Sequence, residues 1–112
     1  MPDVKRRSMC PITSTLDIIG DKWTLIVVRD LLMGIKRYSD FLETGESITT
    51  SILANRLKRL EVEKIICKKP YQNNPIRYEY ELTKKGKDLT PVFDQIINWA
   101  TNYRSEVIEG KL

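Results

Sequence analysis

The chain has 112 residues, enough for one domain with a buried core, and its 41% hydrophobic and 30% charged residues are ordinary for a globular protein. No apolar run approaches ~18 residues, which argues against a membrane span, and no apolar segment follows the first cations, which argues against a secretory signal. Histidine is absent, and Cys10 and Cys67 form no metal-ligand or disulfide pattern. We therefore expect a cytoplasmic protein that is not an enzyme and has no metal and no cofactor.

The net charge of +4 is unevenly distributed along the chain. Residues 36–87 carry twelve cations and seven anions, whereas residues 88–112 carry two cations and four anions. This segregation predicts a basic face formed by the middle of the chain and a different role for its last segment.

Two helices are predicted after a polar N-terminal arm over residues 1–12. Residues 13–20 form a short helix that ends at Gly20, where a glycine in the left-handed conformation commonly terminates a helix. Residues 21–34 form a second helix, with Asp21 as its N-cap. This second helix is apolar on most sides, so we expect it at the centre of the core.

Two further helices complete the predicted helical part of the domain, which spans residues 13–64. Residues 38–45 form a short helix with Ser39 as its N-cap, and residues 49–64 form a longer one with Thr49 as its N-cap. A short turn joins these two helices, as in a helix-turn-helix motif.

The hydrophobic period then changes from that of a helix to that of a strand. Residues 66–69 predict a strand, residues 70–75 have the composition of a turn, and residues 76–82 alternate apolar and polar side chains. Residues 65–82 are therefore predicted to form a β-hairpin, the wing of a winged helix-turn-helix.

Two helices are predicted in the last segment, residues 83–112. One begins in residues 83–89, and the last and longest occupies residues 91–108, with Pro91 in its first turn. The predicted fold is α+β but mostly α: a single winged helix-turn-helix domain over residues 1–112, with a two-stranded wing and a C-terminal dimerisation helix.

The predicted helix over residues 49–64 has two different faces. Leu53, Leu57 and Leu60 fall on one stripe at about 100° per residue, so this side faces the core. The other side has short polar side chains at its N-terminal end and cations further along; it comprises Ser51, Asn55, Lys58 and Arg59, flanked by Thr50 and Arg56. Short side chains let a helix approach base edges and cations reach phosphates, as a helix in the major groove requires.

Cations and amides outside this helix extend the predicted surface for double-stranded DNA. Thr50, Ser51 and Asn55 are expected at base edges, and Asn55 can make a bidentate contact with adenine. Most of the cations are expected at phosphates, whereas Arg56 could contact a base, hold a phosphate or pair with a carboxylate. The amides at the hairpin tip would reach the minor groove or the backbone. The predicted DNA-binding residues are Arg37, Thr49, Thr50, Ser51, Asn55, Arg56, Lys58, Arg59, Lys69, Asn73, Asn74 and Arg77.

A charged helix face can also be an ordinary solvated surface. A winged helix that docks a protein or an RNA without specific DNA readout is therefore an alternative. The predicted hairpin and the charge segregation favour DNA. The salt dependence of binding to random duplex DNA would separate the two, because neutralised phosphates release counterions.

The last predicted helix carries an apolar stripe wider than the small core needs. Its apolar residues follow a spacing of 4, 3, 4, 3 and 4, which resembles a heptad seam. We expect a two-fold interface between two copies of the chain, and packing wholly within one chain is the alternative. The predicted interface residues are Phe93, Ile96, Trp99, Ala100 and Tyr103.

Cys10 follows three cations at residues 5–7 and precedes Pro11. Nearby positive charge can lower the pKa of a thiol and make it reactive. A redox-sensing thiol and a small packing residue both remain open interpretations of Cys10, whereas Cys67 in a strand is expected in the core.

Five short motifs are spread over residues 10–104, and they are Cys10–Pro11, Gly20–Trp23, Arg37–Ser39, Arg56–Glu61 and Tyr80–Gly86. Together they closely resemble the HxlR-type transcriptional regulators, a MarR-like winged-helix group. The resemblance implies a homodimeric regulator that binds an inverted repeat near a promoter.

The resemblance also assigns roles to parts of this chain. It implies that the helix over residues 49–64 is the recognition helix, that residues 70–77 form the wing tip, and that Cys10 senses oxidants or electrophiles, as in part of the family. Members often carry charged residues after the capping residue, where this chain has Thr50 and Ser51. The resemblance therefore does not supply the operator sequence, the target genes or the effector.

Overall fold

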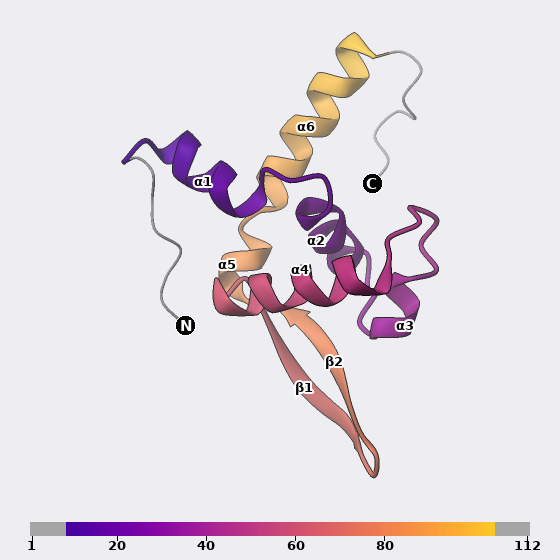
Figure 1. The fold of residues 1–112 in the computed structure, drawn as a ribbon. Helices are drawn as coiled ribbons and strands as arrows, with labels where there is room; N and C mark the ends of the chain where they lie inside the picture. Colours follow the sequence, from indigo (N-terminus) through magenta and orange to yellow (C-terminus); the bar gives the residue numbers. More distant parts are fainter. Residues whose placement is uncertain (1–8, 105–112) are drawn as a thin grey trace.

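The computed structural model describes residues 9–104. Its elements are α1 (Pro11–Ile19), α2 (Thr24–Leu32), α3 (Tyr38–Phe41), α4 (Thr50–Val62), β1 (Ile66–Asn73), β2 (Ile76–Leu82), α5 (Lys84–Lys87) and α6 (Thr90–Tyr103). Figure 1 shows the hairpin of β1 and β2 projecting from one side of α4, while α6 extends in the opposite direction. This mostly helical architecture with an antiparallel wing and a C-terminal helix confirms the predicted fold class.

The core lies between α2 and α4. Val27 and Val28 of α2 are almost completely buried, and so is the predicted leucine stripe of α4, formed by Leu53, Leu57 and Leu60. Full burial of such a side chain contributes about 1.5–3 kcal/mol. The stripe therefore fixes which face of α4 points inward and leaves the opposite face to solvent.

The junction between α1 and α2 is longer than the sequence predicts, because residues 20–23 separate the two helices. Gly20 has φ −80°, so the predicted left-handed glycine is wrong; a Cβ there would collide with the carbonyl oxygen of Leu16, which explains why a glycine fits. Helix α2 begins at Thr24 and not at residue 21, because Asp21 lies in the preceding turn. The carboxylate of Asp21 accepts hydrogen bonds from the backbone N–H groups of Trp23 and Thr24 at 2.9 and 3.1 Å, as expected of a capping residue.

Helix α3 is shorter than predicted, and Arg37 occupies the N-cap position that was predicted for Ser39. Gly45 at φ 91° and Ser47 at φ 62° then turn the chain toward α4 in a loop and not in further helix. Thr49 caps α4 as predicted, since its side-chain oxygen accepts the N–H of Ile52 at 3.3 Å.

The first strand of the hairpin is longer than predicted. The strands pair from Ile66 opposite Leu82 to Asn73 opposite Ile76, so only residues 74 and 75 form the turn. The prediction of a turn over residues 70–75 is wrong because β1 is an edge strand, where Pro70 can be accommodated. The pairing is irregular between Pro70 and residue 72.

Helix α6 begins at Thr90 with Pro91 in its first turn, as expected, and ends at Tyr103. The rest of the helix predicted to residue 108 lies outside the described residues. Phe93 is only 7% exposed and belongs to the core of its own chain, so its assignment to an intermolecular interface is wrong. Within residues 9–104, no helix is both long and apolar enough to cross a membrane.

Candidate nucleic-acid interface

The outward face of α4 presents the short polar residues that were predicted at base edges. Ser51, Asn55 and Lys58 are exposed on the side opposite the buried leucines, and Thr50 is exposed at the edge of this face. The hydroxyl of Tyr38 donates a hydrogen bond at 2.8 Å to the carbonyl oxygen of Thr50, which ties α3 to the first turn of α4. The structure therefore brings four predicted DNA-binding residues together on one helix face.

The hairpin supplies a second group of predicted residues. Asn73, Asn74 and Arg77 are exposed at its tip. Lys69 lies further down the hairpin and forms an ion pair with Glu81 at 3.3 Å. The tip therefore offers amide and guanidinium groups, whereas the charge of Lys69 is partly offset.

Arg37 connects the hairpin to the helix-turn-helix. Its Nε lies 3.1 Å from a carboxylate oxygen of Glu79, and its guanidinium lies 3.8 Å from the ring centroid of Tyr71. The N–H of Tyr80 also donates to the carbonyl oxygen of Lys36 at 2.8 Å. These contacts position the wing beside α3, so Arg37 has a structural role that its sequence position did not indicate.

Arg56 and Arg59 point from α4 toward the α1–α2 junction. Arg56 Nε donates to Asp21 Oδ1 at 2.9 Å, and Arg59 Nη2 donates to the carbonyl oxygen of Ile18 at 3.2 Å. Arg59 also forms an ion pair with Asp21 at 3.5 Å. These two predicted DNA-binding residues therefore make intramolecular contacts in the structure.

Asp21 is the centre of this cluster, and the sequence reasoning treated it only as a cap. Burial opposes its ionisation, but hydrogen bonds from Thr24 and Arg56 and from the backbone N–H groups of Trp23 and Thr24 outweigh burial and hold the pKa of Asp21 well below its usual range. Asp21 is therefore a carboxylate at neutral pH. Asp21 lies in the motif Gly20–Trp23 and Arg56 in the motif Arg56–Glu61. Their membership in these motifs is the feature of the sequence that could have indicated a shared role.

A second set of predicted site residues lies on α6. Ile96 and Trp99 are 48% and 60% exposed, and the ring of Tyr103 lies near that of Trp99, with centroids 5.7 Å apart and the planes tilted by 43°. These residues, together with Val92, line or flank a shallow apolar groove. Ala100 is half-buried. On α1, Ile12 and Leu16 are also exposed. The apolar surface of α6 is thus separate from the hairpin tip (Figure 1), whereas α1 contacts α4 through Ile18 and Arg59.

Cys10 is exposed at the N-cap position of α1. Hydrogen bonds from the backbone N–H and the hydroxyl of Thr13, and from the backbone N–H of Ile12, lower the pKa of the Cys10 thiol. Cys67 in β1 is half-buried.

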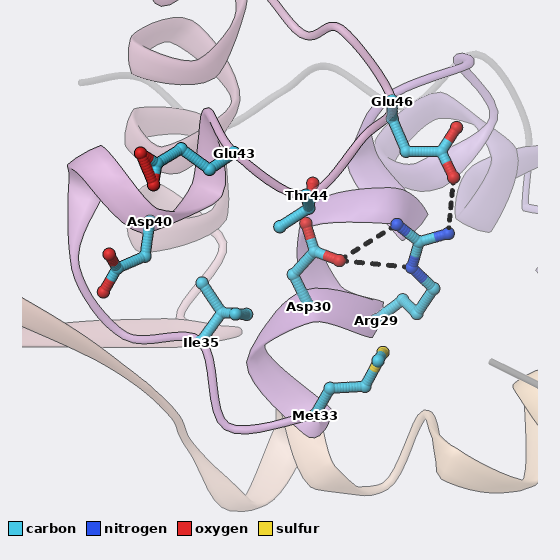
Figure 2. Close-up of a pocket in the computed structure, with 8 residues that line it drawn as sticks. All are labelled: Arg29, Asp30, Met33, Ile35, Asp40, Glu43, Thr44 and Glu46. Carbon is cyan, nitrogen blue, oxygen red and sulfur yellow. Dashed lines mark hydrogen bonds and ion pairs between the residues drawn. The ribbon is translucent and has the colours of Figure 1, made fainter.

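An acidic hollow between α2 and the α3–α4 loop was not predicted. Figure 2 shows Arg29 between the carboxylates of Asp30 and Glu46, each at 3.0 Å, with Asp40 and Glu43 on the opposite wall. Burial works against the charge of Arg29, but its hydrogen bonds to Glu46 and Asp30 outweigh this and raise its pKa. In the part of the chain that the structure describes, no group of three or more His, Cys, Asp or Glu side chains is placed to hold a metal ion.

Comparison with known proteins agrees with this geometry. The profile of the HxlR-like helix-turn-helix family matches residues 18–108. This chain belongs to that family. The HTH-type transcriptional regulator YvaP of Bacillus subtilis strain 168 is 34% identical to this HxlR-like chain over 101 residues, covering 89% of the chain and 94% of YvaP.

Two solved structures of regulators also resemble this HxlR-like protein. The reduced form of the transcriptional regulator YodB from B. subtilis has a TM-score of 0.73 at 31% identity, covering 90% of this chain and 100% of YodB. The reduced form of the redox regulator HypR has a TM-score of 0.77 at 35% identity, covering 85% of this chain and 94% of HypR.

Proposed function

We propose that this HxlR-like protein is a transcriptional regulator that binds double-stranded DNA sequence-specifically, with α4 in the major groove and the hairpin tip at the flanking backbone or minor groove. The observation that carries the proposal is the outward face of α4, where Ser51 and Asn55 are exposed opposite the buried leucine stripe and Thr50 is exposed beside them. Short polar side chains on such a face suit base-edge contacts. Lys58 and Arg77 are the exposed cations best suited to phosphates.

We also propose that the protein acts as a homodimer on an inverted repeat. The support is the apolar surface of α6 and α1, because large apolar side chains such as Ile96 and Trp99 favour a partner surface over water. A two-fold dimer presents two copies of α4, and two copies read a DNA site that has the same two-fold symmetry.

Selection of bound sequences from a random duplex pool tests this function. We expect an enriched site with two inverted half-sites whose centres lie about one helical turn apart, or a multiple of it. Affinity for this site should fall steeply with salt, because bound phosphates release counterions. Recovery of no sequence preference, with salt-insensitive binding, would favour a protein- or RNA-docking role.

A redox response through Cys10 is a second proposal. It rests on the exposure of Cys10 and on the hydrogen bonds that lower its thiol pKa, and a structural relative, HypR, is a redox regulator. The thiolate would attack peroxide and break the O–O bond, giving a sulfenic acid on Cys10 and releasing hydroxide.

Peroxide treatment of three proteins tests the role of Cys10. Wild type and Cys67→Ser should change their DNA affinity, whereas Cys10→Ser should not respond. The pKa of Cys10, measured by the pH dependence of alkylation, should lie below the ~8.5 of a free cysteine. An unresponsive wild type, or a response lost in Cys67→Ser alone, would contradict the proposal.

A further inference from the structure

We propose that Asp21 and Arg56 are positioning residues that set the orientation of the Asn55 side-chain amide, and thereby determine which base-edge groups the protein can read. The proposal rests on the proposed function, because it takes Asn55 to face DNA. It concerns the specificity of that surface, so binding itself and its sequence preference can be tested separately.

The first step is the rigidity of Asp21. Its carboxylate accepts the N–H of Trp23 at 2.9 Å and the N–H of Thr24 at 3.1 Å, and it also accepts the hydroxyl of Thr24. Three donors from the start of α2 thus hold one carboxylate. Asp21 is consequently a fixed point of the helical core, although it lies in a turn.

The second step is the arginine that connects this fixed point to the recognition helix. Arg56 Nε donates to Asp21 Oδ1 at 2.9 Å, while Arg56 Nη1 donates to Asn55 Oδ1 at 2.6 Å. A guanidinium group is planar and rigid, so an anchor on one of its nitrogens also fixes the direction of the others. Arg59, one turn further along α4, holds the carbonyl oxygen of Ile18 at 3.2 Å and restrains the same junction.

The third step concerns the amide of Asn55, which is exposed on the face proposed for DNA. Because its Oδ1 accepts the hydrogen bond from Arg56, the opposite end of the amide is the Nδ2 amino group, which is a donor. The group that Asn55 meets on a base should therefore be an acceptor, such as a purine N7, the O6 of guanine or the O4 of thymine. The bidentate adenine contact would need Oδ1 to accept from adenine as well as from Arg56, so we expect the amino group to make the discriminating contact.

The hydrogen bond between Arg56 and Asn55 also affects the entropic cost of placing Asn55 on DNA. A solvent-exposed amide on a helix samples several rotamers, and ordering it on DNA has an entropic cost. Arg56 removes part of this cost beforehand by holding Asn55 in one orientation. We therefore expect loss of Arg56 to reduce discrimination between sequences even where overall binding survives.

A double-mutant cycle tests the coupling between these two residues. Arg56→Lys, Asn55→Ala and the double variant are compared with wild type on the selected DNA and on DNA altered at a base pair where Asn55→Ala weakens discrimination without abolishing it. Lysine keeps the charge, but one ammonium group does not reproduce the fixed geometry in which two guanidinium nitrogens donate to Asp21 and to Asn55. We expect each single variant to lose about fivefold or more of the discrimination, and the double variant to lose no more than Asn55→Ala alone.

Arg29→Lys is the matched control. The Arg29 side chain is 20% exposed, like that of Arg56, and Arg29 also joins two groups, Asp30 and Glu46. We expect Arg29→Lys to retain full discrimination. The proposal is overturned if Arg56→Lys discriminates like wild type, if the two losses add, or if Arg29→Lys causes the same loss.

Exchange of donor for acceptor tests the orientation of the amide. In Asn55→Asp the group facing DNA becomes an acceptor, so repeated selection should shift the preference at the affected position toward cytosine, whose N4 is a donor. An unchanged preference would overturn the assignment of Nδ2 as the reading group.

A measurement without DNA separates this inference from the proposed function. NMR relaxation of the Asn55 side-chain NH2 should show a restricted amide in wild type and Arg29→Lys, and a mobile amide in Arg56→Lys and Asp21→Ala. If the wild-type protein selects no DNA sequence, the proposed function fails. If the wild-type amide is as mobile as that of Arg56→Lys, the positioning role fails, whatever the protein binds.

Discussion

The two ends of the molecule in Figure 1 differ in the kind of side chain that they expose to solvent. At the end formed by α4 and the hairpin, most exposed side chains are polar or charged, although Tyr71 and Ile76 of the hairpin are also exposed. Several cations there are paired, as Lys69 is with Glu81 and Arg37 with Glu79. At the end formed by α6 and α1, large apolar side chains such as Trp99 and Ile12 are exposed. Polar groups can remain in water, whereas exposed apolar surface gains about 25 cal/mol per Å² when it is covered. The difference supports the proposal that a second copy of the chain binds at one end and DNA at the other.

Helix α6 shows the same contrast on a smaller scale. Phe93 is buried in the core of its own chain, while Ile96, one turn further along, is about half exposed. A continuous apolar stripe in sequence is therefore divided between two roles. Its first turn stabilises the monomer, and its later turns form the surface proposed for a second copy of the chain.

The largest expected effect comes from charges placed on the exposed part of α6. Ile96→Glu combined with Trp99→Glu should give a folded monomer, as measured by light scattering. Its operator affinity should fall by about 10²–10⁴-fold, because two linked recognition helices bind as one unit and a single helix does not. Asn98→Glu, an exposed position on the other side of α6, is the control and should remain dimeric. A double variant that stays dimeric would refute the interface.

Truncation of Phe93 should lower the stability of the fold but leave dimerisation intact. Phe93→Ala should lower the free energy of unfolding by about 3–5 kcal/mol, because it leaves a cavity in the core. Chemical denaturation measures this loss, and light scattering of the remaining folded protein should still report dimers. If Phe93→Ala instead yielded monomers of normal stability, the division of α6 into two roles would be wrong.

At the α4 end, two lysines should differ in their response to salt. Lys58→Ala should reduce the slope of log affinity against log salt by about one, because one phosphate contact is lost. Lys69→Ala should reduce the slope by less, since Lys69 is already paired with Glu81 at 3.3 Å. A salt series with random duplex DNA measures both slopes, and equal reductions would show that the Lys69–Glu81 pair opens on DNA.

The smallest expected effect is the pH dependence of Asp21. Hydrogen bonds hold its pKa below the ordinary 3.8, so its ionised form stabilises the folded state at neutral pH. Asp21→Asn should cost about 1 kcal/mol at pH 7, the size of a lost cap after allowance for solvent screening.

The difference between wild type and Asp21→Asn should shrink as the pH falls below 3.8 toward the lowered value in the folded protein. Urea denaturation at several pH values measures this difference. A gap that widens in acid would have the wrong sign for a carboxylate that is stabilised in its ionised form.

The sequence predicted the order of the elements because their periodicities are local. The leucine stripe of α4, the alternation of residues 76–82 and the Thr49 cap each depend on residues within a few positions. The error at residues 70–75 arose where turn composition decided, and the error at residues 38–45 arose where a candidate N-cap, Ser39, was taken as the start of the helix. Turn-forming residues there continue a strand or shorten a helix, because tertiary neighbours override local preference.

The candidate site could be predicted only in part. Exposure of Ser51, Asn55 and Lys58 follows from the helical wheel, since the leucines must face inward. The contact between Asp21 and Arg56 joins positions 35 residues apart, and no local pattern in one sequence indicates such a pair. Phe93 was misassigned for a similar reason. The periodicity of an apolar stripe does not reveal which of its residues are buried in the core of the same chain.

The central claim is that DNA and the second copy of the chain occupy opposite ends of the molecule. Backbone amide NMR of the labelled protein, titrated with the selected DNA, tests it most directly. We predict shifts over Thr50–Lys58 and at the hairpin tip, residues 73–77, with no change along the exposed face of α6. Shifts centred on Ile96 and Trp99, with α4 unaffected, would contradict the account.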